Sequence, residues 1–224
     1  MEITEKARAS AGQSMSKRTA AGIAAAVAGA AAVYYVLMTA SPGEQGYLYR
    51  LMSPVVCAVL LVAEDLFERT GALRISDGTA ALMRLFAALC IIGGRAFAFY
   101  SRVPFYDKML HTLSGILFTL TGAETARRSR GSSAFSAAMT GVMLSLSVGY
   151  VWELFEFAGD ALFGLDSQRW SVGLLGYVPD LGAWLVSDPR GHAIIDTMED
   201  MFVCLAGSVA GAVCAYVSAR RSAI

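Results

Sequence analysis

The stretch AFSAAMTGVMLSLSVGYVWELFEFAGD, residues 134–160, decides the fold class of this chain. It carries no charged residue before Glu153, and an apolar run of about 20 residues is long enough to cross a bilayer as a helix. Three carboxylates then follow, at Glu153, Glu156 and Asp160. At about 100° per residue they share one helix face. An acid facing lipid is costly, so this face should turn toward the bundle interior, a cavity or a partner.

The whole composition agrees with a membrane protein. Hydrophobic residues make up 56% of the chain and charged residues only 16%, which is too apolar for a soluble domain of this length. Long runs of Ala, Leu, Val and Gly show no period-2 alternation, which excludes a transmembrane β-barrel. The net charge is zero and the basic residues are spread among loop ends, which argues against nucleic-acid binding. The predicted fold class is therefore all-α, a polytopic transmembrane helical bundle in contact with the lipid bilayer.

The apolar runs predict about six spans in one transmembrane domain covering residues 19–217, between tails at 1–18 and 218–224. The first run is longer than the usual core of a cleaved signal peptide, so a span is favoured there. A semi-apolar outer loop at 164–191 could cover a pocket, re-enter the membrane or lie on its surface. The predicted spans are Thr19–Ala40, Tyr47–Val62, Ala80–Tyr100, Lys108–Ala126, Ala134–Phe157 and His192–Val217.

Charge counting sets the orientation. With both termini in the cytoplasm, 12 of the 18 Lys and Arg residues fall on the inner side, among them the run RRSR at 127–130. Lys108 is counted with the outer residues. The prediction is N-in and C-in. A GxxxG pair, Gly207 and Gly211, suits close helix packing and is compatible with formation of a homo-oligomer.

Two further stretches repeat the acidic pattern. In YDKMLHTLSG, Asp107 and His111 are four residues apart, and in IIDTMEDMF the same spacing separates Asp196 and Asp200. Residues at this spacing share a helix face. Helix parity then brings these pairs and the acids of residues 153–160 to the same, extracytoplasmic half of the bundle.

Structural explanations compete with a shared site. Asp107 and Asp196 stand near helix starts, where a carboxylate can cap backbone N–H groups. Asp160 can simply be solvated at a helix exit. Glu153 and Glu156 can form ion pairs with Arg95 or Arg102.

If the clusters do meet, the chemistry is that of a cation site. Six carboxylates and one imidazole repel one another unless some are protonated or a cation is present. Oxygen ligands with a single imidazole suit Mg, Mn, Fe(II) or Zn. The predicted metal ligands are Asp107, His111, Glu153, Asp160, Asp196 and Asp200, with Glu156 as a catalytic general base.

Three functions fit such a pocket. The first is a membrane-embedded, metal-dependent enzyme acting on a lipid-borne substrate. The second is a cation- or proton-coupled transporter or channel that uses the same carboxylates. The third is a structural or accessory subunit in which the acids form an ion-paired packing device. The enzyme leads the transporter narrowly, because repeated halves with broken helices are not evident.

The segments YDKMLHTLSG, WELFEFAGD and DTMEDMFVCLAGSVAG together resemble the YjdF-like bacterial inner-membrane proteins, a family of multi-span proteins with no assigned activity. The resemblance covers residues 106–211, about half of the chain. It implies a multi-pass protein of the bacterial plasma membrane. The positions that match the family's motifs are Asp107, His111, Glu153, Glu156, Asp196 and Asp200.

Overall fold

The computed structural model describes residues 29–31, 33–39, 75–128, 132–163, 165–168 and 189–221. Within these ranges the chain forms helices joined by turns and contains no strand, which confirms the all-α class. A short helical segment, Gly29–Thr39, precedes the larger elements. These are α3 (Asp77–Ala88), its π-helical continuation η1 (Leu89–Ala96), α4 (Phe99–Arg102), α5 (Tyr106–Arg127), α6 (Ala134–Phe163) and α7 (Pro189–Arg221).

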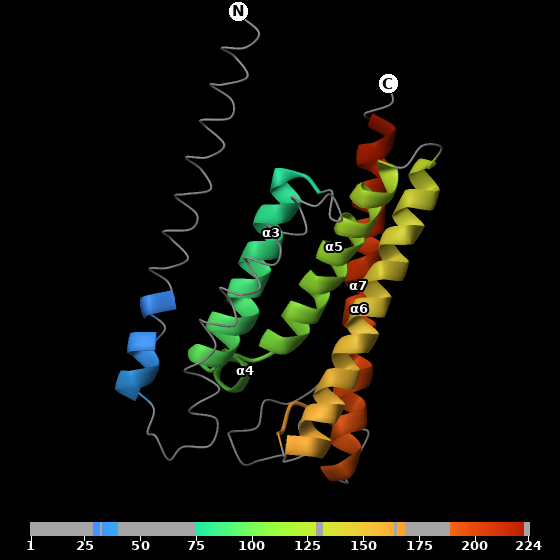
Figure 1. The fold of residues 1–224 in the computed structure, drawn as a ribbon. Coiled ribbons are helices and arrows are strands. Elements are labelled where there is room, and N and C mark those ends of the chain that lie inside the picture. The colour runs from blue at the N-terminus through green and yellow to red at the C-terminus, as the bar shows by residue number, and fades with distance from the viewer. Residues whose placement is uncertain are drawn as a thin grey trace, which may run out of the picture.

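Helices α5, α6 and α7 form a tight bundle, with α3 on the other side of α5 (Figure 1). Small residues allow the close approach. A Cβ on Gly115 of α5 would overlap the Cys204 carbonyl of α7, and one on Gly141 of α6 would overlap the Thr119 carbonyl of α5. Glycine at these points therefore lets backbones touch, as expected for helices packed within a membrane.

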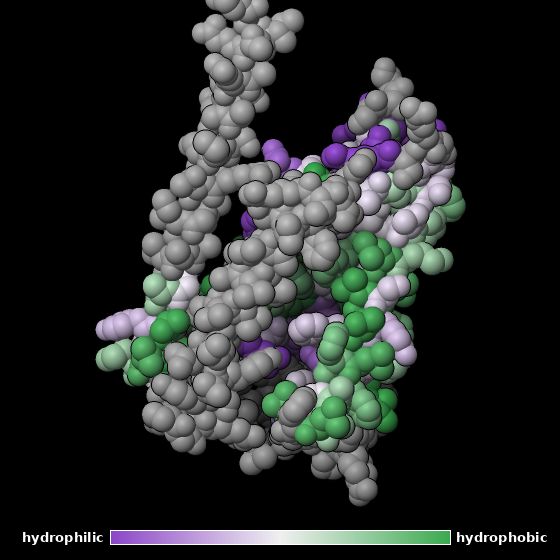
Figure 2. Space-filling view, in the orientation of Figure 1, coloured by the Kyte–Doolittle hydropathy of each residue, from purple (hydrophilic) through white to green (hydrophobic). Residues whose placement is uncertain are grey.

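In α6 and α7, many large apolar side chains are exposed and several polar side chains are buried, the reverse of the arrangement in a soluble protein. Large apolar residues of α6 and α7 are exposed, for example Phe155 at 68% and Phe202 at 67%. Polar residues such as Asp200 and Ser208 are fully buried. In Figure 2, hydrophobic residues lie along the middle and lower part of the right-hand side, where Figure 1 shows α6 and α7. Hydrophilic residues are visible in the hollow beside them. This inversion is the one that lipid, rather than water, favours around a helical bundle.

Among the described residues, three helices are long and apolar enough to cross a membrane: Asp77–Ala96, Ala134–Leu162 and Ala193–Arg221. They correspond to the third, fifth and sixth predicted spans. The fourth prediction coincides with α5, a 22-residue helix that is less apolar because it buries polar side chains between its neighbours. Of the first predicted span only part falls in the described residues, and the second lies outside them. The count of about six spans and the N-in/C-in orientation stay predictions.

Helix α3 begins with a cap supplied partly by α5. Ser76 accepts from the Thr79 backbone N–H at 3.3 Å. Glu124 of α5 accepts from the Ser76 backbone N–H at 2.5 Å, the Ser76 hydroxyl at 3.0 Å and the Thr79 hydroxyl at 2.7 Å. A carboxylate at a helix N-terminus also meets the favourable end of the helix dipole. Glu124 therefore ties α3 to α5 at the end of α5 that carries Arg127.

At its other end the α3–η1 helix meets the start of α5. The hydroxyl of Tyr106 donates to the Leu89 carbonyl at 2.9 Å, where the wider π-helical winding begins. The chain then turns through Ala98 and Phe105, which both have positive φ, to enter α5. These contacts hold the first turn of α5 in place.

Candidate metal centre

The start of α5, the end of α6 and the start of α7 lie at the same end of the bundle (Figure 1). Contacts between titratable side chains join the three helices there. The titratable side chains that they bury are Asp107, Lys108 and His111 of α5, Glu153, Glu156 and Asp160 of α6, and Asp196 and Asp200 of α7. All seven site residues predicted from the sequence are thus buried at this end.

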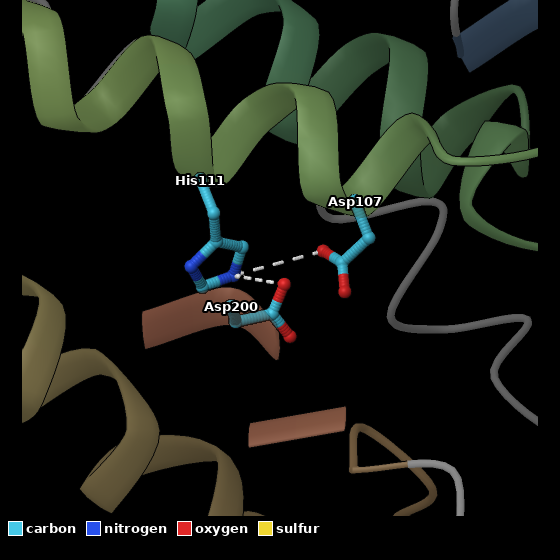
Figure 3. Close-up of side chains that lie close together, drawn as sticks. All are labelled: Asp107, His111 and Asp200. Carbon is cyan, nitrogen blue, oxygen red and sulfur yellow. Dashed lines mark ion pairs between the residues drawn. The ribbon is translucent and has the colours of Figure 1, made fainter. Parts of the chain in front are cut away.

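His111 lies between carboxylates from three helices. Its Nε2 is 3.8 Å from Asp107 Oδ1 and 3.8 Å from Asp200 Oδ1. Its Nδ1 is 3.8 Å from Glu153 Oε1, on the other side of the ring. Figure 3 shows the imidazole turned toward the two aspartates. None of these distances is a hydrogen bond, so the three acids surround the ring without closing on it.

Asp107, His111 and Asp200 fit a divalent cation. One ligand atom from each lies within 4.8 Å of the other two, and all three residues are buried. Zinc bonds to nitrogen and carboxylate oxygen are about 2.0–2.2 Å long, which places ligand atoms about 3.4 Å apart at a tetrahedral angle. The most widely separated of these atoms would have to approach by about 1.4 Å to bind the same ion. Asp200 Oδ1 is fully buried and has no hydrogen-bond partner among the described residues. A buried oxygen of this kind is available to bind a cation.

Glu153 lies on the Nδ1 side of His111, where a carboxylate would orient the ring if Nε2 bound a metal. Neither of its oxygens has a donor at strict hydrogen-bonding geometry among the described residues, and the Thr197 hydroxyl of α7 is a nearby donor. A proton on His111 Nδ1 would point toward Glu153 and leave the Nε2 lone pair facing the aspartates. Such carboxylate–histidine pairs fix the tautomer and ring orientation at metal sites. Glu153 thus lies beside the candidate ligand group instead of within it.

Lys108 is a member of this cluster that sequence reasoning missed. Its ammonium lies 2.5 Å from Asp196 Oδ1 and 2.9 Å from Asp200 Oδ2. Charge counting assigns it to the outer side of the membrane and takes no account of burial, whereas the structure leaves it only 6% exposed. Its place beside Asp107 and three residues before His111 was the available signal, because excess buried acids need a cation and residues three apart share a helix face.

The remaining predicted acids have separate contacts. Glu156 Oε1 accepts from the Trp152 indole N–H at 2.9 Å, while Oε2 has no hydrogen-bond partner in the described ranges. Asp160 accepts from two backbone N–H groups in the turn after α6, those of Ser167 at 2.8 Å and Gln168 at 2.9 Å. The structure thus gives Asp160 a turn-capping contact. Its predicted role as a metal ligand stays a prediction.

Two of the described residues support the site from outside the helices that carry the acids. The Gln168 amide, buried after α6, donates to the Thr197 hydroxyl of α7 at 2.9 Å.

Tyr100 of α4 packs edge-on against Tyr106, with the Arg95 guanidinium 5.0 Å from the Tyr100 ring centre. Burial, followed by the neighbouring Cys90, raises the pKa of the Tyr100 hydroxyl far above its usual range. Tyr100 therefore stays protonated. The rest of the predicted loop at 169–188 lies outside the described residues.

The chain belongs to the family described as Predicted membrane protein (DUF2238), which matches residues 22–221. This match confirms the resemblance to the YjdF-like family and the assignment as a membrane protein. Neither the comparison with curated proteins nor the comparison with solved structures gives a match. The buried cluster is therefore the feature of the molecule that indicates a function.

Proposed function

We propose that this protein is an enzyme of the bacterial inner membrane that binds one divalent cation with Asp107, His111 and Asp200 and acts on a lipid-borne substrate. The observation that carries the proposal is the convergence of three buried ligand atoms within 4.8 Å. In the N-in/C-in orientation this site lies toward the extracytoplasmic face.

The donor set narrows the choice of ion. Two carboxylates and one imidazole are hard or borderline ligands, which suit Mn, Fe(II), Zn or Mg. No cysteine belongs to the candidate group in the described residues, although thiolates would be expected in a site for a soft metal. An ion of this kind supplies Lewis acidity and lowers the pKa of a bound water.

We infer that Glu156 acts as a general base. One of its oxygens accepts from the Trp152 indole, and the second has no hydrogen-bond partner among the described residues, which leaves it available for a proton. Proton transfer by a positioned side chain of this kind typically contributes about 10²–10⁴-fold to a rate.

The surroundings of Glu156 favour a substrate that arrives through the lipid. Trp152 is 43% exposed although its indole nitrogen contacts Glu156, so one side chain separates this acid from the outer surface of α6. The neighbouring Phe155 and Phe157 are 68% and 53% exposed. This apolar surface suits acyl chains, while the buried acids suit a polar headgroup.

Cation or proton transport is the second candidate. It is favoured by the buried contact of Lys108 with Asp196 and Asp200, because ionisable groups paired within a membrane protein commonly mark an ion or proton path. Cation-dependent flux in proteoliposomes, lost in Asp200→Asn, would support transport over catalysis.

Metal analysis of the purified full chain tests the proposal. In gentle, chelator-free detergent preparations, we expect one divalent ion per chain in the wild type and none in Asp200→Asn. Glu124→Gln is the matched control, because this acid lies at the opposite end of α5 and accepts three hydrogen bonds. A wild-type protein that binds no Mn²⁺, Fe²⁺, Zn²⁺ or Mg²⁺ on reconstitution would overturn the metal site.

A further inference from the structure

The Lys108 ammonium is surrounded by oxygens from a single turn of α7. Besides Asp196 Oδ1 at 2.5 Å and Asp200 Oδ2 at 2.9 Å, it donates to the Asp196 backbone carbonyl at 3.2 Å. Glu199 Oε2 is 3.9 Å away. Carboxylates combined with a backbone carbonyl are the donor set that proteins use for hard divalent cations. The lysine nitrogen thus lies where such a cation would be bound.

Asp200 connects this position with the candidate metal site. Its Oδ2 contacts Lys108, while its Oδ1 faces His111 Nε2 at 3.8 Å. A carboxylate that offers one oxygen to each of two neighbouring cations is the arrangement found in bundle sites with two metal ions. Here one of the two positions is filled by an ammonium that the chain itself provides.

We propose that Lys108 acts as the built-in second cation of this cluster, so that replacing it with a small neutral residue opens a second divalent-cation site on Asp196, Asp200 and Glu199. This inference rests on the proposed metal site of Asp107, His111 and Asp200. It makes Lys108 a positioning residue, because its contact with Oδ2 turns the other oxygen of Asp200 toward His111. It also limits the wild-type cluster to one exchangeable ion.

Stoichiometry measures the second site directly. The full chain in detergent is equilibrated with Mn²⁺, freed of loosely held ion and assayed for bound manganese. We expect one Mn²⁺ per wild-type chain and two per Lys108→Ala chain. Because Asp200 would bridge both ions, the electron paramagnetic resonance spectrum should change from that of an isolated ion to that of an exchange-coupled pair. One uncoupled Mn²⁺ per Lys108→Ala chain would overturn the inference while leaving the proposed function intact.

Two companion variants assign the second ion. Lys108→Arg keeps a cation in place and should bind one Mn²⁺, whereas Lys108→Ala/Asp196→Asn removes a ligand of the new site alone and should return the count to one. A second ion that persists in this double variant would contradict the assigned ligands. No Mn²⁺ in the wild type but one in Lys108→Ala would contradict the proposed function and support the cation position of Lys108.

Folding of the variant supplies an independent readout. Lys108→Ala removes the ammonium from a buried cluster of carboxylates, so it should be monodisperse and thermally more stable when purified with Mn²⁺ than without it. The midpoint shift on Mn²⁺ addition should exceed that of the wild type. A variant that fails to fold in both conditions would overturn the inference, because the ion would then not replace the ammonium.

Discussion

The two ends of α5 treat acidic side chains in opposite ways: Glu124 is partly exposed, and the acids at the Asp107 end are buried. At the Arg127 end, Glu124 accepts from Ser76 and Thr79, and both of its oxygens have donors at 2.5–3.0 Å. At the Asp107 end, Asp200 Oδ1 has no hydrogen-bond partner among the described residues. Hydrogen-bond donors therefore account for the first acid, whereas the acids at the second end face one another around His111.

This difference distinguishes an acid that joins two helices from acids that could hold a cation. A buried carboxylate without donors is costly, and a protein keeps such groups where a ligand compensates for them. Variants at the Asp107 end should therefore change cation binding, and variants at the Glu124 end should change only stability.

His111→Ala should nearly abolish cation binding. The imidazole is the nitrogen donor of the Asp107, His111 and Asp200 group. Losing even an outer-shell partner of a metal costs about 10–100-fold in affinity, so loss of a ligand should weaken Mn²⁺ binding by more than about 100-fold. Isothermal titration calorimetry in detergent measures this. Affinity within about threefold of the wild type would place the ion elsewhere and break the contrast between the two ends.

Lys108→Met should destabilise the fold more than any change at the Glu124 end. Removing one partner of a buried ion pair typically costs about 3–5 kcal/mol, because the remaining charge is uncompensated. Lys108 is the partner of both Asp196 and Asp200. Unfolding by titration with sodium dodecyl sulfate, in chelator, measures the loss. Lys108→Met/Asp196→Asn should regain part of it, and a neutral single variant would show that the contact contributes no net stability.

Glu153→Gln should weaken cation binding without abolishing it. Glu153 lies 3.8 Å from His111 Nδ1, on the side opposite the two aspartates. Its predicted effect is therefore that of a residue orienting the ligand, about 10–100-fold in affinity. The Mn²⁺ dissociation constant measures this, with Glu124→Gln as the control. A loss as large as that of His111→Ala would make Glu153 a direct ligand, as the sequence first predicted.

The sequence predicts which acids gather in this cluster, but it does not predict which atoms they contact. Spacing is a property of one helix and parity follows from the order of the spans, and together they place Asp107, His111 and Asp200 at one end. Charge counting treats a lysine at a helix end as solvated, and only packing against α7 reveals that Lys108 is buried. The contact of Asp160 depends on the path of the chain after α6, which helix periodicity does not encode.

A hydropathy threshold also fails to identify α5 as a span, because packing between other helices determines its composition. A hydropathy window favours helices that face lipid, and α6 and α7 pass it because their exposed residues are apolar. Helix α5 buries Thr119 and Thr121 as well as its site residues, so its lower apolar content reflects its place between other helices. Packing through Gly115 brings its backbone close to α7, a contact that the glycine alone could not specify.

Glu124→Gln should have the smallest effect on the site. The variant keeps the size of the side chain but removes its charge and turns one acceptor oxygen into a donor group. Three hydrogen bonds and the start of α3 depend on this carboxylate, so we expect a loss of about 1–3 kcal/mol in unfolding free energy. The Mn²⁺ affinity should stay within about twofold, because α3 supplies none of the candidate ligands in the described part of the chain. Measuring both quantities on one preparation makes the comparison strict. If Glu124→Gln lowered affinity as much as Glu153→Gln, the two ends of α5 would be coupled through the helix, and the distinction between an acid that packs and an acid that binds would fail.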